Sequence, residues 1–441
     1  GGWRVSEEAF WKVNPDLFSS LKIRASYGSL GNGNVSPYSF LELLSISTSG
    51  RVLNGLKNKY TSAPAVMPDG LTWETATTTD VGLDFGMLNN RLQFNGDYYI
   101  RKTTDMYTVG ETLPDVFGAS SPKGNYADMT TKGWEITLTW RDQFTLAEKP
   151  FNYEIRGTLS DYISTIDRYN NQTGNLDDYY AGKRVGEIWG YVTEGLFKDQ
   201  ADIDSHADQT LIQSSSKRIT YPGDVKIKDL NGDHVIDYGN NTVDDHGDKT
   251  VIGNALPRYA YSINLSGDWN NFFLSAFFQG VGKQDWYPSS ECIFWGQYNR
   301  PYNNMPTWHQ GNYWTEDNTD AYLPRYAGYN ASLKSTPQTR YLQNVAYIRL
   351  KNLQFGYTLP QPIVSKAKLQ NVRVYISAEN LWCWSPLYKH TRDLDVTNIY
   401  GSDPDLTDAD MSSGLNGNRG SGDGNSYPQM KSVSLGLSVT F

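Results

Sequence analysis

One segment of the chain carries Asp, Asn and Gly residues in a spacing that suits a calcium ion. From Asp229 the sequence reads Asp-Leu-Asn-Gly-Asp-His-Val-Ile-Asp. Calcium takes about six to eight oxygen ligands, and EF-hand-like loops supply them at the first, third, fifth, seventh and ninth positions. The predicted ligands are Asp229, Asn231, Asp233, the carbonyl of Val235, Asp237, and the later Asp244, Asp245 and Asp248.

Two positions depart from the calcium-loop pattern. The sixth position is His234, where a glycine is expected, and the twelfth is Asn240, which has no carboxylate to bind the ion in bidentate fashion. The alternative interpretation is a solvated acidic turn held by hydrogen bonds from Asx side chains to the backbone. No nucleophile paired with a base lies nearby, so a cation here is predicted to be structural rather than catalytic.

Aromatic residues are concentrated between residues 284 and 326. Exposed rings offer flat apolar faces for sugars or peptide side chains, so this stretch is predicted to contact a substrate or a partner protein. The alternative is that the rings form a small core of the loop itself or rest on a membrane interface. The candidate contact residues are Trp286, Tyr287, Trp295, Tyr298, Tyr302, Trp308 and Tyr313.

The remaining chemistry of the sequence argues against several classes of protein. The chain has a net charge of −9 and a pI near 5.2, with no basic stripe to follow a nucleic-acid backbone. It has no GxSxG, P-loop or CxxC motif, and its five histidines show no metal-ligand spacing. We therefore predict that it is not an enzyme. Two cysteines, Cys292 and Cys383, leave a disulfide bridge undecided.

Strict alternation of apolar and polar residues is the strongest pattern along the chain. In Ser432–Phe441 every odd position is apolar and every even one is small or polar, which is typical of a strand with two different faces. Eleven strands of this kind are predicted. They lie near residues 1–12, 20–29, 77–88, 91–104, 131–141, 150–161, 257–268, 272–283, 345–358, 370–382 and 428–441.

The connections between these strands alternate strictly between short and long. A soluble β-sandwich would also show alternating strands, but an outer-membrane β-barrel in addition has short periplasmic turns at one end and long extracellular loops at the other. We therefore predict an all-β fold, an antiparallel transmembrane β-barrel in the outer membrane of a Gram-negative bacterium. The long extracellular loops are predicted at 162–256, at 284–344 (rich in aromatics) and at 383–427 (acidic and rich in Gly).

The direction of the strands predicts how much of a barrel the chain contains. If the last strand ends in the periplasm, counting back makes the first of eleven strands run toward the periplasm as well. A complete bacterial barrel has an even number of strands and begins in the opposite direction. The chain is therefore predicted to be the C-terminal portion of a barrel of about 22 strands, a size associated with plugged transporters.

Several segments, in this order, resemble the SusC/RagA-like group of TonB-dependent outer-membrane transporters of Bacteroidetes. They include "LKIRASYGSLGNGN" (21–34), "TKGWEITLTW" (131–140), "GEIWGYVTEGLF" (186–197), "PGDVKIKDLNGDHVID" (222–237), "YWTEDNTDAYLPRY" (313–326) and "YIRLKNLQFGYTLP" (347–360).

The resemblance implies a function and a set of partners. It implies a TonB-dependent importer of oligosaccharides or peptides whose plug domain and N-terminal strands lie outside this sequence. It also implies a SusD-like surface lipoprotein that closes over the barrel as a lid, TonB acting through the plug, and contact with outer-membrane lipid but not with nucleic acid. The alternative is a secreted or surface all-β protein that binds glycans as an adhesin.

Overall fold

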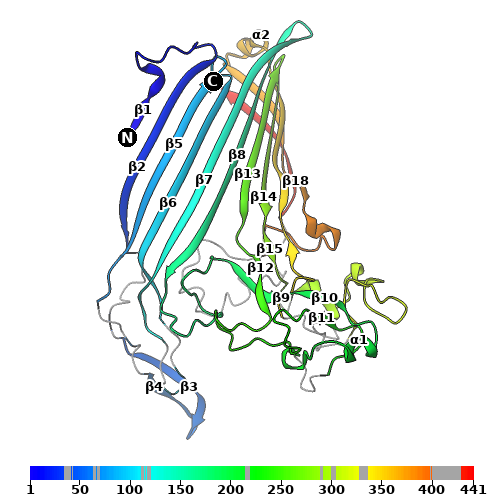
Figure 1. The fold of residues 1–441 in the computed structure, drawn as a ribbon. Helices are drawn as coiled ribbons and strands as arrows, with labels where there is room; N and C mark the ends of the chain where they lie inside the picture. The colour runs from blue at the N-terminus through cyan, green and yellow to red at the C-terminus, as the bar shows by residue number, and fades with distance from the viewer. Residues whose placement is uncertain are drawn as a thin grey trace.

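The computed structural model describes residues 1–33, 41, 43–62, 66, 70–110, 114, 116, 121–213, 219–288, 292–298, 304–326, 336–397, 399 and 429–441. In that part of the chain, eleven strands form one antiparallel sheet, which we call the wall (Figure 1). The prediction of eleven strands is confirmed. In spatial order they are β1 (Gly2–Arg4), β2 (Phe18–Asn32), β5 (Glu74–Met87), β6 (Leu92–Val109), β7 (Lys123–Leu146), β8 (Lys149–Arg168), β13 (Arg258–Trp269), β14 (Phe272–Lys283), β17 (Tyr347–Thr358), β18 (Asn371–Trp384) and β19 (Ser432–Thr440).

Several predicted strand boundaries are wrong. At the long-loop end, β7 begins at Lys123 instead of near residue 131, and β8 ends at Arg168 instead of near residue 161. The first strand was expected to run over residues 1–12, but β1 ends at Arg4, and a 3₁₀ turn over Val5–Glu7 buries Val5. The stretch 142–150 was expected to be a connection, yet β7 and β8 continue through it to a two-residue hairpin. Its central residues Ala147 and Glu148 have φ angles of 46° and 62°. Positive φ at both central residues matches the right-handed twist of the flanking strands, so the ladder continues to the end.

All the short connections lie at one end of the wall, and all the long ones lie at the other (Figure 1). Asn270 and Asn271 make another tight hairpin with positive φ at both residues, a conformation that asparagine tolerates better than most residues. The short connection between β17 and β18 holds the one-turn helix α2 (Gln361–Val364). The predicted alternation of short and long connections is present with one exception: the connection between β6 and β7, residues 110–122, is no longer than the connection between β1 and β2, residues 5–17.

The two faces of the wall differ in polarity, as neighbouring rows of the ladder show. Leu274, Phe355, Ile376 and Leu435 lie directly opposite one another across four strands and are 48%, 49%, 50% and 78% exposed. The next row pairs serine and glutamine side chains, since alternate residues face opposite sides. Large apolar side chains are thus exposed together on one face, and polar ones cover the other.

The polar face is the concave one. A hollow of about 850 Å³ near the short connections is lined by side chains from several strands of the wall, among them Arg141, Glu154, Asp268 and Arg373. A single hollow can touch β7, β8, β13 and β18 only from the inside of the curve. The wall is therefore an open part of a barrel with a polar interior and an apolar exterior. Among the described residues no helix is long and apolar enough to cross a membrane.

The long connections contain their own secondary structure. Two of them, residues 169–257 and 284–346, form a compact unit with residues 385–399, and we call it the loop body (Figure 1). It holds α1 (Gln200–Asp204) and three two-stranded sheets: β9 (Glu187–Tyr191) with β12 (Lys249–Asn254), β10 (Thr193–Leu196) with β11 (Val225–Ile227), and β15 (Asp285–Trp286) with β16 (Gln343–Asn344). A further hairpin, β3 (Ser45–Leu53) with β4 (Leu56–Ser62), lies apart from the loop body at the same end.

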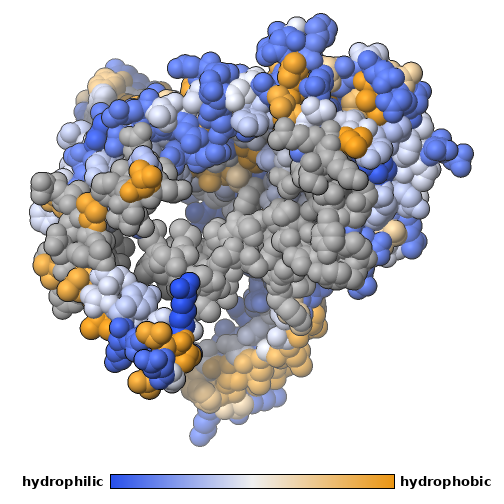
Figure 2. Space-filling model, turned by 90° about the horizontal axis from the view of Figure 1, so that it is seen from below, coloured by the Kyte–Doolittle hydropathy of each residue, from blue (hydrophilic) through white to orange (hydrophobic). Residues whose placement is uncertain are grey.

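The hydrophobic core of the protein is in the loop body and not in the wall. Its fully buried residues come from all three segments, for example Ile227, Trp295 and Leu387. In the view from below, the described residues in the upper part are mainly hydrophilic, and hydrophobic residues gather toward the lower edge (Figure 2). The loop body therefore has the buried core and polar surface of a soluble domain.

Candidate functional site

Three of the aromatic residues predicted to contact a ligand lie inside the core of the loop body. Trp286, Trp295 and Tyr298 are almost completely buried. The indole Nε1 of Trp295 donates to the carbonyl of Pro288 at 3.2 Å, and the Tyr298 hydroxyl donates to that of Pro324 at 2.6 Å. The polar atoms of Trp295 and Tyr298 are thus satisfied, whereas the buried Nε1 of Trp286 has no hydrogen-bond partner among the described residues. Rings buried in this way serve packing, so for these residues the structure has the loop-core arrangement that was the alternative interpretation.

The other aromatic candidates lie nearer the surface. Tyr287, Trp308 and Tyr313 are partly buried and pack against the same core. Tyr302 lies outside the described residues. Ligand contact stays a prediction for these four residues. The greater part of the predicted acidic loop 383–427 also lies outside the described residues.

The carboxylates of the predicted calcium loop accept hydrogen bonds from the loop's own backbone. Asp229 accepts from the N–H of Gly232 at 2.6 Å and from that of His234 at 2.9 Å. These bonds, the first above all, lower the pKa of Asp229. Asp233 accepts from Val235 N–H at 2.8 Å. The loop therefore has the Asx-turn geometry of the alternative interpretation.

Asp248 ties the two ends of this acidic loop together. It is fully buried and accepts from the N–H of Leu230 at 2.7 Å and from that of Asp237 at 3.0 Å. His234 adopts a φ of 66°, the left-handed conformation that a calcium loop normally assigns to glycine. In the described part of the chain, no group of three or more His, Cys, Asp or Glu residues is arranged to hold a metal ion. Calcium binding by the eight predicted ligands stays a prediction.

A buried ion pair that the sequence did not predict joins two long connections. The Nε of Arg325 lies 2.7 Å from Oδ1 of Asp224, which is almost completely buried. The guanidinium also lies 4.4 Å from the centre of the Tyr221 ring. Asp224 and Arg325 stand in two of the segments that carry the family resemblance, but they are 101 residues apart. Only the pairing in space reveals their role, which is to hold one connection against the other.

His309 lies at the centre of the aromatic core. Its two ring nitrogens are 2.8 Å from the Tyr326 hydroxyl and 2.9 Å from the carbonyl of Phe294. Burial lowers the pKa of His309 to about 4. The neutral ring can donate to the carbonyl and accept from the hydroxyl, so it acts as a polar link within the core. Nothing in its sequence spacing indicated this role.

A second buried ion pair connects the wall to the loop body. The Arg349 guanidinium in β17 lies 2.6 Å from Oδ1 of Asp395, and both side chains are buried. Cys383 faces Arg349 in the ladder between β17 and β18. Cys292 and Cys383 are not joined by a disulfide bond in the structure, which answers the question of a bridge that the sequence left open.

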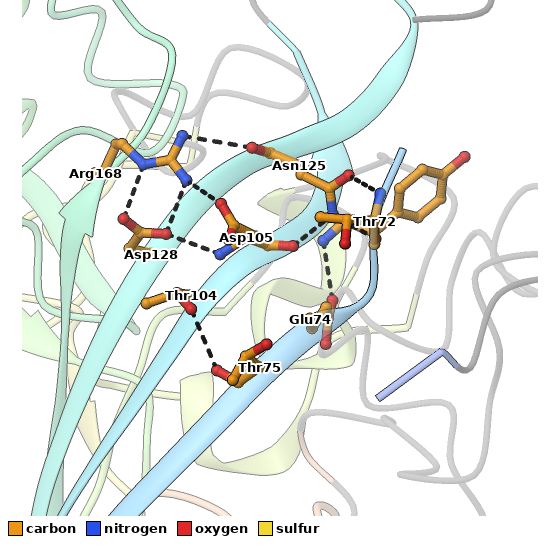
Figure 3. A network of polar contacts seen from close by, with 9 residues as sticks. Thr72, Glu74, Thr75, Thr104, Asp105, Asn125, Asp128 and Arg168 are labelled. Atoms are coloured by element: carbon orange, nitrogen blue, oxygen red, sulfur yellow. Dashed lines mark hydrogen bonds and ion pairs between the residues drawn. The ribbon is translucent and has the colours of Figure 1, made fainter. Parts of the chain in front are cut away.

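The long-loop ends of four strands are joined by a polar network, which Figure 3 shows. Arg168 at the end of β8 binds both carboxylate oxygens of Asp128 in β7 at 2.8 Å and Asp105 in β6 at 3.0 Å. Asn125 donates to the backbone carbonyls of Asp105 and Thr72. Closer to the short connections, on the same concave face, Arg24 of β2 forms ion pairs with Asp84 of β5 and Asp97 of β6. Several charges inside the wall are therefore paired with one another.

Taken together, the fold and the loops define a class of protein: part of a large antiparallel β-barrel with a polar interior and a folded cover at one end. No family model matches the chain. The chain is 28% identical to the TonB-dependent receptor P3 of Formosa agariphila and 23% identical to the TonB-dependent receptor SusC of Bacteroides thetaiotaomicron, in both cases over its whole length. The predicted resemblance to TonB-dependent receptors of the SusC type is confirmed.

Solved structures show the same fold. The RagAB peptide importer in its open-open state superposes on the whole chain with a TM-score of 0.68 at 18% identity. A second structure of the RagAB peptide transporter covers 87% of the chain with a TM-score of 0.66. The chain spans about two fifths of the length of these relatives, namely 41% of receptor P3 and 42% of the RagAB chain.

Proposed function

We propose that this chain is the C-terminal part of a TonB-dependent importer of oligosaccharides or peptides in the outer membrane of a Gram-negative, Bacteroidetes-like bacterium. The observation that carries the proposal is the reversed polarity of the wall, whose apolar side chains are exposed and whose charges face inward. Such a wall suits lipid outside and an aqueous or plugged lumen inside. The similarity to TonB-dependent receptors over the whole chain supports the same function. In this proposal the protein binds and moves its substrate and is not an enzyme.

The loop body fits the entrance of such an importer. It lies at the end of the wall that the long connections mark as extracellular, and it is folded around its own core. A folded entrance can hold a chamber in a fixed shape. The remaining strands of a barrel of about 22, the plug and the TonB-binding segment would be supplied by the rest of the protein, and TonB would provide the energy.

The hairpin β3–β4 supports the proposal of a lid protein. Its apolar residues Ile46 and Leu56 are 70% and 67% exposed. A lone two-stranded hairpin is marginally stable in water, so a partner surface would stabilise it. Its only charged residues are Arg51, Lys57 and Lys59, all basic, in a chain of net charge −9. We propose that the hairpin contacts an acidic face of a SusD-like lipoprotein.

Uptake by cells tests the importer. The full-length gene is deleted in its own host, and growth on a panel of peptides and oligosaccharides is measured, with complementation by the intact gene and by a form lacking the TonB-binding segment. Only the intact gene is expected to restore growth on some member of the panel. Equal growth of all strains on every substrate, or folding of the full-length protein as a detergent-free monomer, would contradict the proposal.

The hairpin is tested separately with the lid protein encoded beside the importer. Replacing Arg51, Lys57 and Lys59 by Glu is expected to reduce co-purification with the lid and to remove its salt dependence. A matched control replaces Arg101, Lys102 and Lys132 of the wall by Glu, so that one arginine and two lysines change in both variants. Equal co-purification of all forms would show that a lid binds elsewhere, and no co-purification with the wild type would reject the lid.

A further inference from the structure

A charged pocket of about 740 Å³ opens at the surface of the loop body, between the segment around β10, β11 and α1 and the chain that leads into β16. It belongs neither to the predicted calcium loop nor to the aromatic core. The residues that line it are Glu194, Gly195, Leu196, Lys198, Asp199, Asp202, Lys226, Thr319, Asp320 and Arg340.

The lining of this pocket selects against a neutral sugar. Seven of these ten described residues are charged, and none of them carries an aromatic ring. A site for a neutral sugar usually places an aromatic ring against an apolar face of the sugar, and this lining offers none. The chemistry of the pocket therefore suits a ligand that has charges of its own.

Arg340 provides a fixed cation in the pocket. Its Nε donates to the carbonyl of Tyr322 at 2.8 Å and one terminal nitrogen donates to that of Ala321 at 2.6 Å, so the guanidinium is held in place by neutral acceptors. In the described part of the chain neither Arg340 nor Lys198 forms an ion pair with a carboxylate. A guanidinium held in this way keeps further N–H donors for a ligand carboxylate.

The pocket offers the opposite charge as well. Lys226 is already paired with Asp202 at 2.8 Å and lies 3.9 Å from Glu194. Asp199 and Asp320, by contrast, form no ion pair with any cation in the described part of the chain. The pocket thus has two cations and two carboxylates that are not neutralised by protein side chains. A polyanion would meet repulsion from the carboxylates, whereas a ligand with both charges would not.

We infer that this pocket binds a short peptide with free ends. Its C-terminal carboxylate binds Arg340 and Lys198, and its ammonium group binds Asp320 or Asp199. This inference rests on the proposed function, because it makes the pocket a capture site at the entrance of the importer. It narrows the substrate from oligosaccharides or peptides to peptides.

Calorimetric titration of the full-length protein in detergent tests the inference. The probes are tetra-alanine with free ends, the same peptide as its C-terminal amide, and trigalacturonate. Free tetra-alanine is expected to bind, amidation to weaken binding at least about tenfold, and trigalacturonate not to bind. Equal binding of the amide, or binding of trigalacturonate in preference to the peptide, would overturn the inference.

Substitutions locate the binding. Lys198→Gln and Asp320→Asn are each expected to weaken tetra-alanine binding several-fold, while the matched control Lys228→Gln, an exposed lysine of the same connection outside the pocket, has no effect. Arg340→Gln is expected to have the largest effect, but it also removes two hydrogen bonds of the loop body. Lys198→Gln and Asp320→Asn are therefore the decisive variants. If both bind tetra-alanine as tightly as the wild type, the pocket is not the binding site.

Uptake separates a failure of this inference from a failure of the proposed function. If the wild type imports peptides in a TonB-dependent way and the pocket variants import them equally well, the pocket is not the capture site, although the importer stands. If tetra-alanine binds the pocket but TonB-dependent growth on no substrate is found, the importer fails while the binding site stands.

Discussion

The wall and the loop body bury different parts of the same chain. In the wall, Leu274 and Ile376 are about half exposed and Arg24 is paired on the concave side. In the loop body, Trp295 and Ile227 are completely buried and charges such as Lys198 are at the surface. In both regions apolar side chains avoid water, but the arrangements are opposite. In our proposal the apolar side chains of the wall face membrane lipid, whereas those of the loop body can only pack against one another.

The wall and the loop body also differ in how much their ion pairs contribute to the stability of the fold. Ion pairs of the wall such as Arg141–Glu154 keep substantial contact with water, with side chains 55% and 28% exposed, and exposed pairs contribute little to stability. In the pair Asp224–Arg325 the carboxylate is only 2% exposed, although the arginine is 28% exposed, so the buried Asp224 depends on Arg325 for its counter-charge. Substitutions should therefore separate the two regions.

The largest effect is expected from breaking the buried pair. Arg325→Met leaves Asp224 as an unpaired buried charge, which costs about 3–5 kcal/mol, so the loop body should open while the wall stays folded. Hydrogen exchange of residues 221–227 measures this in the full-length protein. The matched wall variant Arg141→Met should cost less than about 1 kcal/mol. Equal exchange in both variants would mean that the two regions do not differ in this respect.

A charge on the apolar face of the wall should have the next largest effect. Ile376→Arg places a cation toward lipid and is expected to destabilise the folded protein by about 2–4 kcal/mol, as measured by denaturant unfolding in phospholipid vesicles. Ser377→Arg, the neighbouring residue on the concave face, should be tolerated much better. If the two variants unfold alike, the assignment of the faces is wrong.

Acid should destabilise the loop body and not the wall. The pKa of His309 is lowered to about 4 by burial, whereas an unfolded histidine has a pKa near 6.5. The folded state therefore favours the neutral ring. This stabilisation is complete above pH 6.5 and is lost as the pH falls from there toward 4, by about 2 kcal/mol at pH 5.

Hydrogen exchange at pH 7 and pH 5, corrected for the intrinsic rate, measures this loss in residues 292–298. His309→Gln should remove most of the pH dependence while the exchange of β13 and β14 stays unchanged in both forms. A variant that keeps the full acid sensitivity of the wild type would assign it to another group, with His390 the first candidate because burial and Lys389 lower its pKa as well.

The smallest expected effect concerns the acidic loop. If Asp229, Asp233 and Asp237 bind calcium, 1 mM Ca²⁺ should slow exchange of the backbone amides in residues 229–248, and a chelator should reverse it. Magnesium serves as the control, since it demands a smaller and more regular shell of ligands. Exchange that is indifferent to calcium would leave the loop as an Asx-bonded turn.

The strands of the wall could be predicted because their signal is local. Alternation in Ser432–Phe441 or around Ile263 reports which face each side chain occupies, whatever the rest of the chain does. The prediction of β1 was wrong because aromatic residues such as Phe10 and Trp11 extend the pattern beyond the point where the backbone turns. The continuation of β7 and β8 was missed because Ala147–Glu148 is not a common sequence for a tight hairpin.

The loop body could not be predicted in the same way. Trp286 and Trp308 lie in the same aromatic-rich stretch, yet one is fully buried and the other only partly, since burial depends on which distant segment packs against each ring. Asp224 and Arg325 carry no signal of a pair across 101 residues. The same holds for the pocket, whose charges come from two connections.

The sequence by itself determined the eleven strands, their two faces, the ends at which short and long connections lie, and the resemblance to TonB-dependent receptors. Each of these features depends on residues that are close together along the chain. Only the tertiary structure decided which aromatics are core, which carboxylates of the acidic loop bind backbone N–H groups, and where unpaired charges meet in a pocket. Those outcomes depend on loss of contact with water, and that loss is fixed only when segments far apart in the sequence pack together.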